Sequence, residues 1–319
     1  MPQKGRAIWD LNRPVAVWKS KDLLGNRVVS SLTVILRTAG CKWRQCTMCG
    51  YSSEGAPATG HELLSQFDHA IQRLFDEKMV KIYTSGSFLD PSEVPEDVRE
   101  KILNILCGIG IERLVIETRP EHVSSERVES CLSMIDTEFA IGLETSSDLI
   151  REKLINKGFS FQDFAQASQL IHDKGGRVKA YLLLKPPLLA EGHAIRDAIS
   201  SANAARAYAD IISLNLCNIQ RNTFVERLWE RGEYRPPWLW SALEVLKESP
   251  GPIICDPVAA GTKRGPHNCG LCDSAVAEAI RKHSLTQDSG IFDDLECQCK
   301  KAWGKIVSLE EYSFGSSLD

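Results

Sequence analysis

From residue 32 onward, short apolar runs rich in β-branched residues alternate with longer segments in which apolar residues recur every three to four positions. The short runs predict buried strands, and the longer segments predict helices that bury one face. The predicted strands cover residues 32–37, 80–84, 113–117, 138–143, 178–184 and 211–215. The predicted helices cover residues 62–78, 95–106, 161–174 and 194–208.

Six strands that alternate with helices favour an α/β fold with parallel strands and right-handed crossovers. Six units are too few to close an eight-stranded barrel, so we expect a partial, open (β/α)6 barrel. In parallel α/β folds, ligands bind at the carboxyl ends of the strands. Polar and glycine-bearing segments follow the predicted strands at residues 84–87, 117–120, 144–146, 185–187 and 217–220. The sequence therefore predicts a binding site at that end of the barrel.

The chain has 319 residues, of which 43% are hydrophobic and 25% are charged, as in ordinary globular proteins. A net charge of −4 gives no global support for nucleic-acid binding. Between positions 148 and 185, however, basic residues outnumber acidic ones, which leaves open a local basic patch or a solvated surface. These basic residues are Arg151, Lys153, Lys157, Lys174, Arg177, Lys179 and Lys185.

Eleven cysteines are present, and most of them gather at two places in the chain. The sequence has no apolar run long enough to span a bilayer and no signal-peptide pattern at its start, so we expect a cytoplasmic protein. Clustered cysteines in a cytoplasmic protein favour metal binding over disulfides. The scattered Cys107, Cys131 and Cys217 are expected to be small buried hydrophobic residues.

The first cysteine group is Cys41-x4-Cys46-x2-Cys49, directly after the first predicted strand. Three thiolates at this spacing can hold three irons of a [4Fe-4S] cluster and leave the fourth iron open to a substrate. The alternative is a structural zinc site that takes a distant fourth ligand.

The second cysteine group lies between residues 253 and 303, after a change of composition near residue 250. Its members are Cys255, Cys269, Cys272, Cys297 and Cys299. Four of these five thiolates would suit one structural zinc ion, as in zinc ribbons. A second iron–sulfur cluster and free thiols are the alternatives. We therefore divide the chain into an N-terminal arm (1–29), the barrel (30–250) and a cysteine-rich lobe with a tail (251–319).

The chain resembles the radical S-adenosylmethionine (SAM) superfamily, in the branch that includes the Elongator catalytic subunit. The resemblance rests on the spacing of the first cysteine group and on residues 116–120, 154–158 and 228–234. Residues 37–41 and 83–91 and the cysteine-rich tail are most similar to the family of radical SAM subunits of archaeosine synthase.

This resemblance implies a radical enzyme that acts on tRNA with a partner. In that family, a transglycosylase-like subunit joins lysine to a cyano-deazaguanine base in the D-loop of tRNA. The radical SAM subunit then breaks the lysine side chain's C–N bond and leaves the amidine of archaeosine. The cofactors implied are the cluster and SAM, which yield a 5′-deoxyadenosyl radical when an electron donor reduces them.

The resemblance also implies roles for individual residues. Cys41, Cys46 and Cys49 would hold the cluster, whose open iron the amino and carboxylate groups of SAM would chelate. The Thr84-Ser85-Gly86 segment would receive the amino group of SAM, although it lacks the glutamate that is usual there.

Further site residues are expected in the loops at the carboxyl ends of the predicted strands. Glu144 is expected to bind the ribose hydroxyls, and Met48 to pack near the adenine or the cluster. Lys157 would meet the methionine carboxylate, unless it is a solvated helix lysine. Glu117 and Arg119 are candidate catalytic or substrate contacts, or alternatively a structural ion pair. His122 and His193 have no partner pattern and are expected to be ordinary histidines.

Overall fold

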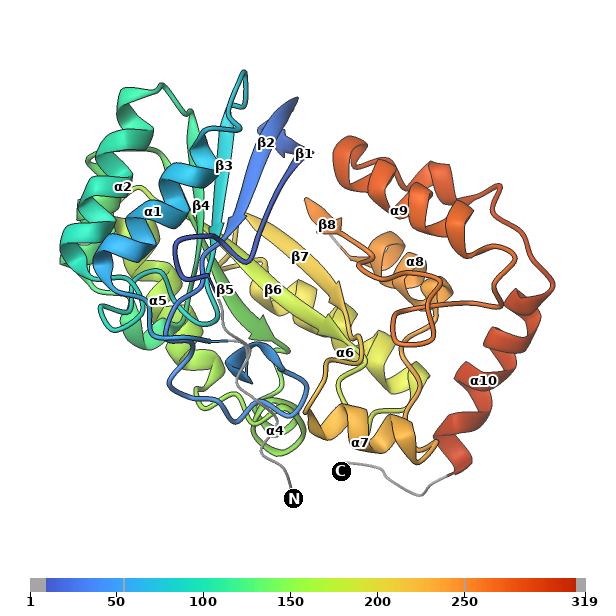
Figure 1. The fold of residues 1–319 in the computed structure, drawn as a ribbon. Helices are drawn as coiled ribbons and strands as arrows, with labels where there is room; N and C mark the ends of the chain where they lie inside the picture. Colours follow the sequence, from blue (N-terminus) through green and yellow to red (C-terminus); the bar gives the residue numbers. More distant parts are fainter. Residues whose placement is uncertain (1–9, 54, 250, 314–319) are drawn as a thin grey trace.

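The computed structural model describes residues 10–53, 55–249 and 251–313. One eight-stranded sheet with strand order β1 to β8 forms the centre of the molecule (Figure 1). The strands are β1 (Ala16–Leu24), β2 (Arg27–Ile35), β3 (Met79–Tyr83), β4 (Arg113–Thr118), β5 (Thr137–Glu144), β6 (Arg177–Leu184), β7 (Ile211–Leu216) and β8 (Ile253–Cys255). Strand β1 is antiparallel to β2, and all other neighbours are parallel.

The six predicted strands are confirmed as β2 to β7, and the α/β class is confirmed with them. Two strands were not predicted. Strand β1 lies in the expected N-terminal arm and pairs with β2 across a turn at Gly25, whose φ is +59°. Strand β8 has only three residues in the expected cysteine-rich lobe. The three-part division at 29/30 and 250/251 stays a prediction, and the sheet extends across both points.

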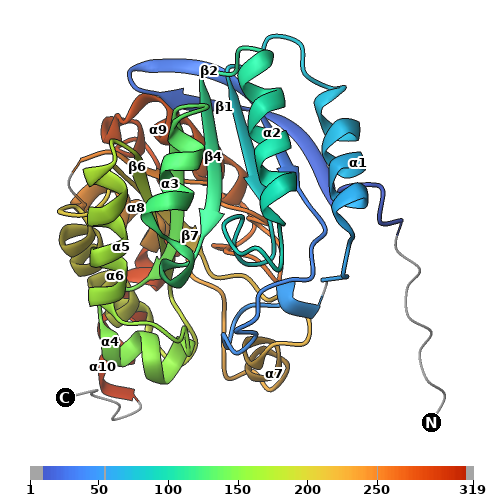
Figure 2. The same cartoon turned by 90° about the vertical axis from the view of Figure 1, so that its left-hand side faces the viewer.

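Helices that connect successive strands cover the outer face of the sheet, whereas the last two helices follow β8 (Figure 2). The helices are α1 (Gly60–Ile71), α2 (Glu96–Gly108), α3 (Ser125–Leu132), α4 (Asp148–Ile150), α5 (Phe161–Asp173), α6 (Glu191–Ala205), α7 (Phe224–Glu230), α8 (Leu239–Glu248), α9 (Asp273–Thr286) and α10 (Cys299–Ser313). A π-helical turn (Arg151–Ile155) continues α4. None of the helices in the described ranges has the length and apolarity that a membrane span requires.

The four predicted helices are present with shifted ends. Helix α1 begins after Thr59, whose side chain forms a capping box with Glu62. It ends at Ile71 instead of residue 78, because the chain turns there and leaves Phe75 91% exposed. The apolar pattern beyond Ile71 therefore does not continue the buried face of the helix.

The sheet curls into a half-barrel. Helix α9 packs on β8 and also contacts β1, at the opposite edge of the sheet. Figure 1 shows β1 and α9 facing each other across the open side of the curl. The strands point toward the end of the molecule where α4 and α7 lie. The expected site is therefore at the mouth of a curved, open barrel.

Side chains along the central strands alternate between the two faces of the sheet. Those that point outward are fully buried under the helices: Val34, Ile82, Ile116, Ile141, Leu182 and Leu214. One step along each strand, a set that we call the inner layer remains partly exposed: Tyr83, Glu117, Gly142, Tyr181 and Asn215. The hydrophobic core therefore lies between sheet and helices, and this layer of the concave face is partly accessible to solvent.

Candidate active site at the strand ends

The first cysteine group lies on the long loop after β2, and its three thiols are half-buried. Several hydrogen bonds tie this loop to the segments that follow the neighbouring strands. The Thr47 N–H donates to the Ile155 carbonyl at 2.9 Å, and the Thr47 carbonyl accepts from the Phe224 N–H at 3.0 Å. The Gly50 N–H donates to the Gln220 side chain at 2.5 Å. The loop is thus held across the barrel mouth, between the segments that follow β5 and β7.

The spacing of these thiols suits a cluster better than a single metal ion. Each cysteine of a cluster binds a different iron, so its sulfur stands apart from the others. Within the described ranges, the sulfurs of Cys41, Cys46 and Cys49 are not among the groups of potential ligand atoms that lie within 4.8 Å of one another. This observation favours the cluster over the alternative zinc site.

Arg119 contacts the cysteine loop through the side chain of Trp43. Its guanidinium pairs with Glu121 at 2.5 Å and donates to the Lys157 carbonyl at 3.1 Å. It also lies 5.9 Å from the ring centre of Trp43, whose Nε1 donates to the Asn156 carbonyl at 2.6 Å. The alternative of a structural ion pair between Glu117 and Arg119 is therefore wrong, since Arg119 has a different acidic partner.

Lys157 is not the solvated helix lysine that the sequence left open. Its ammonium lies 2.5 Å from Glu144, and the two side chains are only 12% and 10% exposed. Burial by itself disfavours this ammonium, but the neighbouring Glu144 carboxylate raises the pKa of Lys157. Burial raises the pKa of the Cys46 thiol to about 11, and Lys157 opposes this rise. Lys157 and Glu144 thus form one charged pair beside the cysteine loop.

The segment 84–86 packs directly against that loop. A Cβ on Gly86 would lie 2.7 Å from the Cα of Cys41, so only glycine fits. Glu93, which sequence reasoning missed, places its carboxylate at the same position. It accepts hydrogen bonds from Thr38 Oγ1 at 2.7 Å, from the Ser87 N–H at 2.8 Å and from the Thr84 hydroxyl.

Glu117 occupies the inner layer at the end of β4. Its carboxylate accepts hydrogen bonds from the Thr84 N–H and from the Tyr181 hydroxyl, which also bonds to Tyr83. Burial raises the pKa of Glu117 to about 8, although the nearby Lys157 lowers it. A carboxyl group thus stands beside the predicted SAM-binding segment, inside the barrel.

Met48 is half-buried and packs against apolar side chains at the ends of β6 and β7, among them Leu183 and Cys217. This position is on the barrel side of the cysteine loop. Its contact with adenine or a cluster stays a prediction.

The basic residues between 148 and 185 do not form a free basic patch. Lys179 pairs with Glu138 and Lys185 with Glu191, both at 2.6 Å and both buried. Each of the remaining members also has an acidic neighbour: Arg151 with Asp148, Lys153 with Glu152, Lys157 with Glu144, Lys174 with Glu129 and Arg177 with Asp210.

The second cysteine group is reduced to four members. The sulfurs of Cys269, Cys272, Cys297 and Cys299 all lie within 4.8 Å of one another. Cys255 is not part of the group, because it is buried on β8, where its N–H donates to Ser284. Sequence spacing alone did not separate the five cysteines, since the grouping depends on how α9 and α10 pack.

The four sulfurs have the geometry of a single tetrahedral ion. Two pairs are 3.7 Å and 3.6 Å apart, Cys269 with Cys297 and Cys272 with Cys299. A tetrahedron with zinc–sulfur bonds of about 2.3 Å has edges of about 3.8 Å. N–H donors also reach two of the thiols, from Asn268 to Cys272 at 3.3 Å and from Trp240 to Cys299 at 3.2 Å. Such outer hydrogen bonds are typical of metal thiolates.

One further expectation needs correction. Cys107 is exposed, because it falls on the solvent side of α2, whereas Cys131 and Cys217 are buried as expected. His122 is a satisfied histidine, in agreement with the expectation, since its Nε2 lies 3.5 Å from Asp90. His193 is half-buried on α6.

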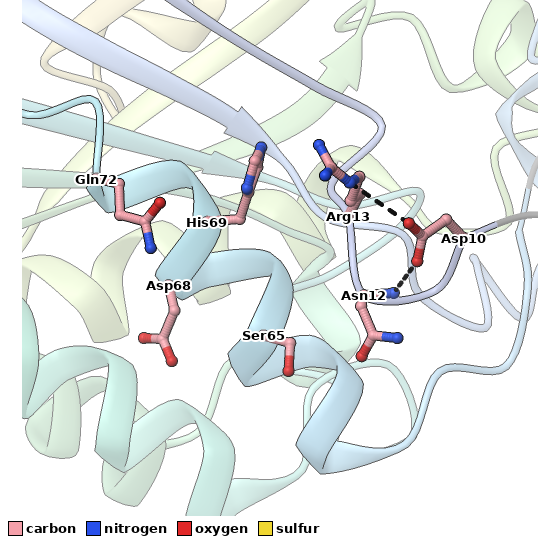
Figure 3. A pocket seen from close by; sticks show the side chains of 7 residues that line it. All are labelled: Asp10, Asn12, Arg13, Ser65, Asp68, His69 and Gln72. Carbon is pink, nitrogen blue, oxygen red and sulfur yellow. Dashed lines mark hydrogen bonds and ion pairs between the residues drawn. The ribbon is translucent and has the colours of Figure 1, made fainter.

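A cavity of about 460 Å³ lies away from this site (Figure 3). It is lined by side chains of α1 and of the segment before β1: Asp10, Asn12, Arg13, Ser65, Asp68, His69 and Gln72. Arg13 and Asn12 both bind Asp10, at 3.4 Å and 3.0 Å. The cavity is on the outer surface of α1 and contains no cysteine and no inner-layer residue.

Comparison with known proteins agrees with this arrangement. Residues 35–190 match the family model of the Radical SAM superfamily. The archaeosine synthase subunit beta of Methanosarcina acetivorans is 45% identical over 323 residues, which cover 96% of this chain and 93% of that protein. The subunit beta of Thermococcus kodakarensis is 40% identical over 309 residues, or 91% and 95% of the two chains.

A solved structure supports the fold. The N-terminally truncated Elp3 of the archaeon Methanocaldococcus infernus superimposes with a TM-score of 0.51 at 18% identity. The match covers 69% of this chain and 59% of Elp3. At this identity, the likeness shows a shared fold alone.

Proposed function

The chain belongs to the radical SAM superfamily and, within it, to the family of archaeosine synthase beta subunits, and from this membership we propose that it performs the radical step of archaeosine formation in tRNA. The proposed reaction breaks the C–N bond of a lysine–deazaguanine adduct in the D-loop and leaves the amidine of archaeosine. The observation that carries the proposal is the position of the cysteine loop, which lies across the barrel mouth beside the Lys157–Glu144 pair.

The proposed cofactors are a [4Fe-4S] cluster and SAM. Cys41, Cys46 and Cys49 would hold the cluster, and when both groups are bound they supply a 5′-deoxyadenosyl radical. The Thr84-Ser85-Gly86 segment lies against Cys41 and is assigned to the amino group of SAM.

Two further residues are assigned to SAM on the same grounds. The Lys157–Glu144 pair presents one cation and one anion beside the cysteine loop. This pair suits a ligand with both a carboxylate and ribose hydroxyls. Arg119 fixes the loop through Trp43, so we assign it a positioning role and leave Glu117 as the substrate contact.

The proposed partners are the adduct-bearing tRNA, a transglycosylase-like subunit that makes the adduct, and an electron donor in the cytoplasm. The name "subunit beta" of the relatives supports a second subunit. In the described ranges the basic residues of segment 148–185 are paired with acids, so tRNA contacts on this chain would come from other surfaces or from the partner subunit.

We also propose one zinc ion in the four-cysteine centre. The sulfur separations of 3.6 and 3.7 Å support a single tetrahedral ion over a second cluster, in which each thiolate would bind a separate iron. Closed four-thiolate sites are structural, so this zinc would stabilise the lobe and take no part in the reaction.

The direct test is 5′-deoxyadenosine formation by the anaerobically reconstituted protein. We expect tRNA that carries the lysine adduct to stimulate this product at least tenfold over unmodified tRNA. Equal, slow formation with both tRNAs would contradict the proposed substrate while leaving the radical chemistry in place.

A further inference from the structure

Glu117 is the inner-layer residue of β4, between β3 and β5. It is the register partner of Tyr83, since Ile116 pairs with Ile82 one residue earlier. On β5 the inner-layer position is Gly142, and the Lys157–Glu144 pair packs against it, since a Cβ there would lie 2.7 Å from Lys157 Nζ. Glu117, Tyr83 and Tyr181 are each partly exposed on the concave face.

Three of the other carboxylates on the inner side of the sheet have cationic partners. Below the inner layer, Asp22 pairs with Lys81 and Glu138 with Lys179, each at 2.6 Å. These pairs close the floor of the barrel. Above the layer, Lys157 lies 2.5 Å from Glu144.

Glu117 has no such partner. No lysine, arginine or histidine nitrogen in the described part of the chain forms an ion pair with its carboxylate, and its two hydrogen bonds come from neutral donors. Lys157 acts on Glu117 from a longer distance and is itself paired with Glu144. Glu93 also lacks an ion pair, but it is only 2% exposed and accepts hydrogen bonds on both oxygens. Glu117 is thus the carboxyl group that a ligand in the barrel can reach.

Without a counter-ion, burial disfavours the ionised form of a carboxyl group relative to its protonated form in the ligand-free protein. Its raised pKa is consistent with this environment. A cationic ligand would compensate the negative charge and bind by charge-assisted hydrogen bonds. The position of Glu117 inside the barrel therefore suits the binding of a cationic ligand.

The proposed substrate contains such a cation. Addition of the lysine side-chain amine to the nitrile of a cyano-deazaguanine gives an amidine, which is a strong base and is protonated at neutral pH. The bond to be broken joins this amidine to the lysine carbon chain. A planar amidinium presents two N–H donors on one side, as arginine does to a carboxylate.

We propose that Glu117 is the counter-ion of the substrate's amidinium, held in position by the Tyr181 hydroxyl and the Thr84 N–H. This inference depends on the proposed function. Because Thr84 belongs to the segment assigned to SAM, the contact places the C–N bond beside the source of the radical. Glu117 therefore determines where the substrate is cut as well as whether it binds.

The test is a binding measurement on the reconstituted holoenzyme with S-adenosylhomocysteine present. The ligand is a D-arm RNA that carries the lysine adduct, titrated by calorimetry. Glu117→Gln keeps the shape and an acceptor oxygen but removes the charge, and should weaken binding roughly 10- to 100-fold. Affinity for S-adenosylhomocysteine should change less than about twofold, since Gln still accepts from Thr84.

A matched control is Glu112→Gln, just before β4 at the other end of the strand. Glu112 is 38% exposed and pairs with Arg27, so this variant should bind as the wild type does. A second RNA with a pentylamine adduct keeps the amidine and lacks the lysine ammonium and carboxylate. The Glu117→Gln substitution should weaken the binding of both adduct RNAs by the same factor.

The outcomes separate this inference from the proposed function. If wild-type protein binds adduct RNA no better than unmodified RNA, the proposed function fails. If wild type prefers the adduct but Glu117→Gln binds it equally well, only the counter-ion role is refuted. A loss with the lysine adduct but none with the pentylamine adduct would also refute it, by assigning Glu117 to the lysine ammonium.

Discussion

At Gly86, the loop after β3 has no side chain, and the carboxylate of Glu93 lies against that position. The sequence resemblance leads one to expect a glutamate at residue 86 itself. Glu93 comes seven residues later and reaches the same place through hydrogen bonds to Thr38, Thr84 and Ser87. Such a compensation could not be predicted from the sequence, because it depends on the path of the loop between the two residues.

The cysteine assignments lead to a prediction at single residues. Replacing Cys46 by Ala should abolish both the cluster's visible absorbance and SAM cleavage, since two thiolates cannot hold the cluster against solvent exchange. Anaerobic reconstitution followed by absorbance and product assays would measure this. The matched control is Cys107→Ala, an exposed cysteine on α2, which should keep both properties. Retained SAM cleavage in Cys46→Ala would refute its role as a ligand.

Among the secondary-structure elements, α10 depends most on the second cysteine group. Cys299 is its first residue and accepts from Trp240 of α8. Further along, the Trp303 indole donates to Ser241 at 2.9 Å, and Ser241 donates to Glu191 at 2.6 Å. Glu191 in turn pairs with Lys185, at the end of β6. A metal ion in the four-cysteine centre would therefore stabilise a chain of contacts that reaches the barrel mouth.

Metal analysis of variants tests this arrangement. The double variant Cys269→Ser, Cys272→Ser should lose about one zinc per chain and keep the absorbance of the first cluster. Its thermal unfolding should also shift to lower temperature, because structural zinc contributes directly to folding free energy. Cys255→Ala is the control, and it should keep the zinc, since Cys255 lies outside the group of four sulfurs. An unchanged zinc content in the double variant would rule out the centre.

The strands and most helices could be predicted because their apolar residues follow a regular period. Strands β2 to β7 consist mostly of apolar and β-branched residues, whereas β1 mixes Lys19, Lys21 and Asp22 with apolar residues at an edge. Because of this mixture, the sequence pattern did not identify β1 as a strand. The features that could not be predicted depend on tertiary packing. They include which four cysteines come together and the pairing of Lys157 with Glu144.

On the scale of the whole molecule, the half-barrel is open on one side and closed at its floor. Ion pairs close the floor of the barrel, and helices cover its outer face. A ligand would therefore enter through the mouth, under the cysteine loop. The inner layer presents Glu117 near the middle of that space. This arrangement suits a substrate in which a side chain projects from a larger molecule, as the lysine chain of a modified base on a tRNA loop would.

The most direct measurement combines nucleoside mass spectrometry of the tRNA with 5′-deoxyadenosine quantification after reaction with adduct-bearing tRNA, SAM and reductant. We predict that archaeosine appears in the tRNA in proportion to 5′-deoxyadenosine, and that neither forms with Cys46→Ala. The appearance of 5′-deoxyadenosine while the adduct stays intact would contradict the proposal that this chain cuts the lysine C–N bond.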